Sequence, residues 1–107
     1  MALAWTAAET FRFGGGNGKA MVMIQGRLVI TTTAVGNAAD EIPASTFGLD
    51  QIYGCGGIIP DNESKVWMGA PDDTNDSLIT KDPITTDVTN DLPADTYNMC
   101  VWGTTAT

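Results

Sequence analysis

The longest run of alternating apolar and polar positions extends from Ala20 to Thr31. A period of two over this length predicts a long β-strand with one better-buried face. A glycine at position 26 within such a strand predicts a bend or bulge. The expected buried face is Val22, Ile24, Gly26, Leu28 and Ile30, and the expected opposite face is Met21, Met23, Gln25, Arg27, Val29 and Thr31.

A glycine-rich stretch, GGGNGKA, precedes this strand. The run from Thr10 to Phe13 before it also alternates, and Gly and Asn tolerate the positive φ of tight turns, so the pattern predicts a β-hairpin. A phosphate-binding loop is excluded by spacing, because its first glycine would fall at Phe13 and its hydroxyl at Ala20. Residues 1–8 are expected to form an N-terminal arm.

One short helix is predicted near residues 43–48. Pro43 suits a first helical position and Gly48 suits a stop signal. Phe47 and Leu49 are expected to close one end of the core.

The remaining segments are mostly strand-like. Residues 52–59 form a glycine-rich candidate strand, residues 65–70 a third, and residues 78–86 an edge strand broken by Pro83. In the last candidate, residues 96–103, the alternation separates Tyr97, Met99 and Val101 from Cys100 and Trp102. About six strands with at most one short helix predict a single all-β domain of residues 1–107, a small β-sandwich or jelly-roll-like fold.

Charge and hydropathy restrict the partners. Thirteen acidic residues against five basic ones give a net charge of −8, which argues against nucleic acid as a partner. No apolar run approaches the ~20 residues that span a bilayer, so no membrane association is expected. The N-terminal segment lacks the features of a signal peptide, which favours a cytoplasmic site of synthesis.

Few residue types suited to catalysis are present. The chain contains no histidine, which removes the commonest general base and most zinc sites, so we expect neither enzymatic activity nor a cofactor. The segment Asp72–Asp76 resembles the start of a calcium loop, but Ser77 and Pro83 occupy the sixth and twelfth positions, which favours a solvated turn. Cys55 and Cys100 are expected as small buried hydrophobes, and the sequence leaves open whether they pair.

Three segments follow one another in a distinctive order: the turn Gly16-Asn17-Gly18-Lys19, the Ala44–Ile52 segment with its Phe-Gly-Leu, and the closing Asp91–Gly103 strand. This order resembles that of small virion structural proteins of tailed bacteriophages. It implies a non-enzymatic protein on the capsid exterior. The role it favours is a decoration, or cement, protein that binds the major capsid protein and itself, with a trimer favoured. Alternatives are a tail, baseplate or head–tail connector component and, from its tryptophans, a carbohydrate-binding β module.

A docking surface for such a role is predicted around the first hairpin. Methionine surfaces adapt to imperfect partners, although the two methionines of the hairpin would equally suit the second face of a sandwich strand. The arginines would meet an acidic partner. The expected contact residues are Leu3, Trp5, Arg12, Met21, Met23 and Arg27.

Overall fold

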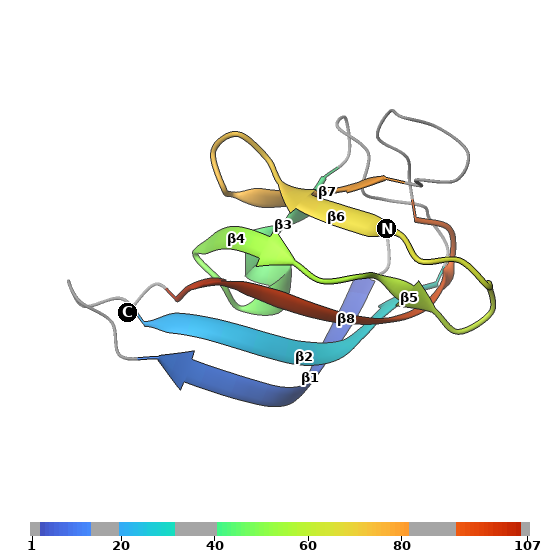
Figure 1. The fold of residues 1–107 in the computed structure, drawn as a ribbon, viewed down its shortest axis with the longest axis horizontal. Coiled ribbons are helices and arrows are strands. Elements are labelled where there is room, and N and C mark those ends of the chain that lie inside the picture. Colours follow the sequence, from blue (N-terminus) through green and yellow to red (C-terminus); the bar gives the residue numbers. More distant parts are fainter. Residues whose placement is uncertain (1–2, 14–19, 32–40, 82–91, 106–107) are drawn as a thin grey trace.

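The protein is a two-layer β-sandwich, seen in a computed structural model that describes residues 3–13, 20–31, 41–81 and 92–105. All strand pairs are antiparallel. One sheet has the order β1 (Leu3–Phe13), β2 (Met21–Ile30), β8 (Asp95–Thr104) and β4 (Gln51–Cys55), and β5 (Ile59–Pro60) also pairs with β8. The other sheet has the order β3 (Ile42–Pro43), β7 (Ser77–Lys81) and β6 (Met68–Pro71), and it lies above the first in Figure 1. The prediction of a small all-β fold is confirmed.

The first two strands form the predicted hairpin. Phe13 pairs with Met21 and Leu3 pairs with Ile30, so the arms remain together over their whole length. Residues 3–8, expected as an arm, are instead the first part of β1. The glycine-rich turn itself, residues 14–19, lies outside the described residues.

The core lies between the two layers. Alternation in β2 and β8, which are central in the larger sheet, turns one face of each strand inward, as the sequence predicted. The buried apolar residues are Val22, Ile24, Leu28, Ile30, Ile42, Ala44, Phe47, Leu49, Ile52, Ile58, Trp67, Leu78, Leu92, Tyr97, Met99 and Val101.

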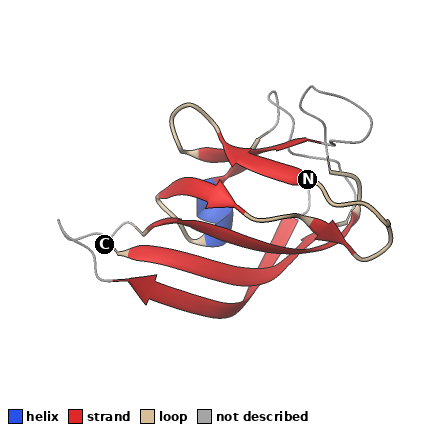
Figure 2. Cartoon of the chain, in the orientation of Figure 1, coloured by secondary structure: helices blue, strands red, loops and turns tan. Residues whose placement is uncertain are grey.

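The one helix described is a short 3-10 turn, Ala44–Phe47, which packs against β1 and β3 and is blue in Figure 2. Pro43 is its N-cap, and Gly48 ends it in the left-handed region with a φ of 75°. The predicted limits are therefore confirmed to within one residue. Phe47 and Leu49 are both buried, as expected.

Two strand predictions need correction. The expected strand 52–59 is divided at Gly56 and Gly57 into β4 and β5, because glycine weakens a strand interior. The pairing of Ile42 and Pro43 with β7 adds another short strand, so the described residues contain eight strands rather than six. The part of the predicted 78–86 strand beyond Lys81 lies outside the described residues. No helix in the described part of the chain is long and apolar enough to cross a membrane.

Candidate docking surface

A β-bulge reverses the direction of the side chains halfway along β1. Before it, Leu3 pairs with Ile30, so odd-numbered residues of β1 face the core. The register shifts between Ala7 and Glu9, so that Ala8 is an extra residue. After the shift, the odd-numbered residues face away from the core.

An apolar patch results on the outer side of the larger sheet. Phe11 pairs with Met23, and Met23 pairs in turn with Trp102 of β8. In the next row Phe13 pairs with Met21. The two phenylalanines are 55% and 53% exposed, and the other three side chains are half-buried. We refer to Phe11, Phe13, Met21, Met23 and Trp102 as the aromatic–methionine face.

The other end of the same side of the sheet is polar. The guanidinium of Arg27 forms an ion pair with the carboxylate of Asp61, and the side-chain amide of Asn98 donates a hydrogen bond to the same carboxylate. Both members of the ion pair are partly exposed, so its contribution to stability is small. The outer side of the sheet is therefore divided into an apolar half and a polar half.

The structure places the six predicted contact residues in four different environments. Leu3 and Trp5 are partly buried and pack against the core, and the Trp5 ring meets Phe47 edge-on with centroids 4.9 Å apart. Met21 and Met23 lie together on the aromatic–methionine face. The two arginines lie elsewhere: Arg27 belongs to the polar half, and Arg12 lies on the same side of the sheet as the core, beyond its covered part.

Sequence reasoning missed three residues of this surface: Phe11, Phe13 and Trp102. The alternation of residues 10–13 was recognised, but no face was assigned to Phe11 and Phe13. Trp102 was assigned to the face opposite Tyr97 but not to the docking surface. A hairpin that pairs Phe13 with Met21 necessarily pairs Phe11 with Met23, since each step back along one strand is a step forward along the other.

One edge of β1 has no pairing strand among the residues that the structure describes, and we refer to it as the free edge. β1 is the outermost strand of its sheet and pairs on one side with β2. The residues from Thr6 to Phe13 are all exposed. Its outward-pointing backbone amides and carbonyls therefore form a row that can pair with another strand.

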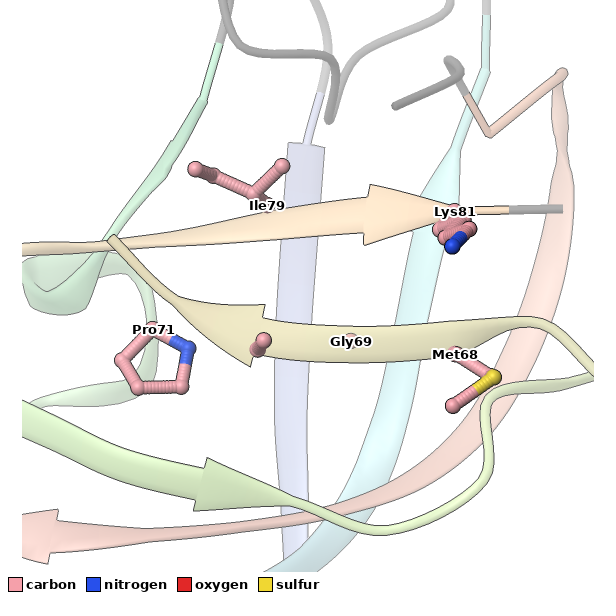
Figure 3. A pocket seen from close by; sticks show the side chains of 6 residues that line it. Met68, Gly69, Pro71, Ile79 and Lys81 are labelled. Atoms are coloured by element: carbon pink, nitrogen blue, oxygen red, sulfur yellow. The ribbon is translucent and has the colours of Figure 1, made fainter. Parts of the chain in front are cut away.

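A second candidate feature is a hollow on the smaller sheet. It has a volume of about 270 Å³ and is lined by Met68, Gly69, Ala70, Pro71, Ile79 and Lys81. Met68 and Lys81, a cross-strand pair, mark one end of it in Figure 3, and Pro71 and Ile79 mark the other. Its lining is apolar except for one lysine, so it offers shape and a single charge rather than a set of reactive groups.

The segment Asp72–Asp76, compared above with a calcium loop and expected as a solvated turn, is a hydrogen-bonded turn. The backbone amides of Asp76 and Ser77 donate to Asp72 Oδ1 at 2.9 and 3.3 Å. Desolvation raises the pKa of Asp72, but these backbone bonds outweigh it and hold the pKa below its ordinary value. Desolvation, followed by the neighbouring Asp72, raises the pKa of Glu41. Among the described residues no group of three or more potential ligands could hold a metal ion.

The two cysteines are free and face opposite sides of the larger sheet. Cys55 pairs with the inward-facing Val101, whereas Cys100 is the next residue along β8 and therefore points outward. Burial, and then the nearby Cys100, raises the pKa of Cys55 to about 12. Both the geometry and this pKa oppose a disulfide or a reactive thiolate at Cys55.

The tryptophans differ in their access to a sugar ring. Trp67 is 3% exposed, so it cannot serve as a stacking platform, and the ammonium of Lys65 lies 5.0 Å from its ring centroid. Trp5 packs against Phe47. Trp102, on the aromatic–methionine face, is the one tryptophan of the three that lies on an outward side of the sandwich.

Comparison with known proteins gives no relative: no family model matches the chain, and no match is found among curated proteins or among solved structures.

Proposed function

We propose that this protein is a non-enzymatic virion structural protein of a tailed bacteriophage, and that it decorates the capsid exterior by binding the major capsid protein. The observation that carries the proposal is the aromatic–methionine face. Two phenylalanines more than half exposed, backed by two methionines and a tryptophan, form an apolar patch without a partner among the described residues. Such patches mark surfaces that bind other proteins.

Burial of this patch supplies the binding energy in the proposal. Each Å² of apolar surface removed from water contributes about 25 cal/mol before the costs of association. Aromatic residues and methionine are enriched in protein interfaces. A modest patch suffices when contacts repeat over a shell, since self-association, with a trimer favoured, and a lattice of identical sites add avidity.

The resemblance of the chain to small virion proteins supports the same proposal. Its segment from Ala44 to Ile52 forms the 3-10 turn and the start of β4, and the described part of its closing segment is β8, next to the hairpin. A tail or connector component would use an apolar face in the same way, and copy number separates the two roles.

Immunogold electron microscopy tests the proposal. Antibodies raised against the purified chain are applied to particles of the phage that encodes it. Gold over the whole head surface is the expected result. Gold confined to the tail or neck would replace decoration with the connector role, and unlabelled particles that also lack the chain by mass spectrometry would refute a virion role.

A further inference from the structure

We propose that the free edge of β1 binds one extended strand of a partner polypeptide, apolar where it meets Phe11 and Phe13 and acidic where it meets Arg12. This inference deepens the proposed function and depends on the same surface. The docking segment is Glu9–Phe13, the regular part of β1 that follows the bulge.

Backbone chemistry specifies that the occupant is a strand. The outer edge of β1 presents amides and carbonyls at strand spacing, and another extended segment satisfies them in register. Natural edges are commonly blocked by proline or lysine. β1 contains neither, and after the bulge nothing interrupts its ladder.

Side-chain alternation specifies the chemistry of the occupant. Opposite residues of an antiparallel pair share a side of the sheet. Partner residues beside Phe11 and Phe13 therefore extend the aromatic–methionine face, and apolar side chains suit them. Partner residues beside Thr10 and Arg12 lie on the other side. Arg12 is exposed and has no carboxylate partner among the described residues, so an acidic residue suits this position.

Charge opposes a second copy of the chain as the occupant. If two copies of β1 paired antiparallel with Phe11 opposite Phe11, the two Arg12 side chains would be diagonal neighbours. If they paired with Arg12 opposite Arg12, the two like charges would face each other directly. β1 and β2 together carry two arginines and one glutamate within a chain of net charge −8. Two arginines less one glutamate give these two strands a net charge of +1. Arg27 pairs with Asp61, so Arg12 is the cation of this edge that favours an acidic partner.

Peptide binding to the full-length, isotope-labelled chain tests the inference by NMR. The probe is a blocked peptide that repeats Val-Asp. The controls are the Val-Lys repeat and the Val-Asp repeat with every amide N-methylated. We expect the Val-Asp peptide to protect the amides of Glu9–Phe13 from exchange, the Val-Lys peptide to bind about fivefold more weakly, and the methylated peptide not to bind.

Two variants assign the effect to the named residues. Arg12→Glu should reverse the preference between the two peptides, whereas Lys81→Glu, the same charge change on the smaller sheet, should leave it unchanged. Phe11→Ser should weaken both peptides. Equal binding of both peptides, shifts confined to other strands, or a concentration-dependent dimer of the chain that shields Glu9–Phe13 would each overturn the inference.

Failure here is distinguishable from failure of the proposed function. If the peptide binds but the particles carry no gold, the strand-binding edge is supported and the virion role is refuted. If gold labels the head but the peptide does not bind, the decoration role is supported and the contact with the capsid lies on another part of the chain.

Discussion

The indole ring of Trp102 lies over Gly54 on the neighbouring strand. A β-carbon at position 54 would fall 2.3 Å from two atoms of this ring, closer than any real contact allows. The absence of a side chain at Gly54 thus makes room for Trp102, the residue of the aromatic–methionine face that lies next to β4. It also explains why the predicted strand is rich in glycine, since such strands let bulky neighbours approach closely.

Gly54→Ala is expected to destabilise the protein by about 1–3 kcal/mol, because the ring of Trp102 must move. Gly56→Ala is the matched control, since its added β-carbon would meet Cys100 at an ordinary 3.8 Å. Urea denaturation followed by tryptophan fluorescence measures both variants. Equal losses in the two variants would contradict this account of Gly54.

Phe11→Ser and Phe13→Ser are expected to change the free energy of unfolding by no more than about 0.5 kcal/mol, because both side chains lie on the surface. Phe47→Ala removes a buried ring of the same type and should cost about 3–5 kcal/mol. Binding of the purified variants to particles stripped of the protein should be lost for the two serine variants. Retained binding by the double variant would remove the aromatic–methionine face from the contact.

Tyr97 is buried, and its hydroxyl donates a hydrogen bond to the carbonyl of Pro93. Tyr97→Phe should therefore cost about 1 kcal/mol in unfolding free energy. Tyr53→Phe is the control, since its hydroxyl bonds to Gln51 in an exposed setting. Denaturant titrations that show no difference between the two variants would argue against a structural role for the buried hydroxyl.

Thiol labelling should distinguish the cysteines. Cys55 has its pKa raised to about 12 and lies on the core side of the sheet, so the native protein should present it as an unreactive thiol. Cys100, on the outer side, should alkylate faster, and mass spectrometry after unfolding should find both thiols free. Recovery of a Cys55–Cys100 disulfide from the folded protein would contradict the assignment of opposite sides.

Stability should fall in acid through Asp72. The folded pKa of Asp72 lies below its ordinary value of 3.8, so its contribution is present above that pH and is lost as the pH falls through the folded value. Glu41 affects the pH dependence of stability in the opposite direction. Its pKa in the folded protein is raised above the ordinary value of 4.5, so its contribution to stability is present below pH 4.5 and is lost as the pH rises through the folded pKa.

Asp72→Asn removes this charge while keeping an oxygen that can accept the turn's hydrogen bonds. Its thermal midpoint should depend less on pH than that of the parent protein across the acid range around 3.8. If the thermal midpoints of the two proteins change with pH in parallel, Asp72 is not responsible for the loss of stability in acid.

The strands with strict alternation could be predicted from sequence, because a period of two along β2 and β8 leaves one arrangement that buries Leu28, Tyr97 and Val101 together. The short helix was equally accessible, since Pro43 and Gly48 act through local backbone preferences. The alternation of each strand and the two ends of the helix can be recognised within a few neighbouring residues, even though the packing they lead to joins distant strands.

The division of strand 52–59 and the strand that carries the bulge were not accessible in this way. A bend or bulge was predicted at Gly26, and the extra residue, Ala8, instead follows Ala7, the partner of Gly26 on β1. The division and the bulge both depend on which strand lies alongside, and pairing partners are distant in sequence: β4 and β5 both pair with β8.

The packing of Leu3 and Trp5 against the core could not be predicted for the same reason. Trp5 was expected outside because it precedes the hairpin, whereas the bulge at Ala8 places it against Phe47.

The bulge absorbs one extra residue, Ala8, without exchanging the two faces of β1. Loss of the codon for Ala8 would make Ala7 and Glu9 consecutive while each kept its partner on β2, so Phe11 and Phe13 would still point outward and Trp5 inward. A codon gained or lost elsewhere in this strand has no bulge to absorb it and would exchange the faces on one side of the change.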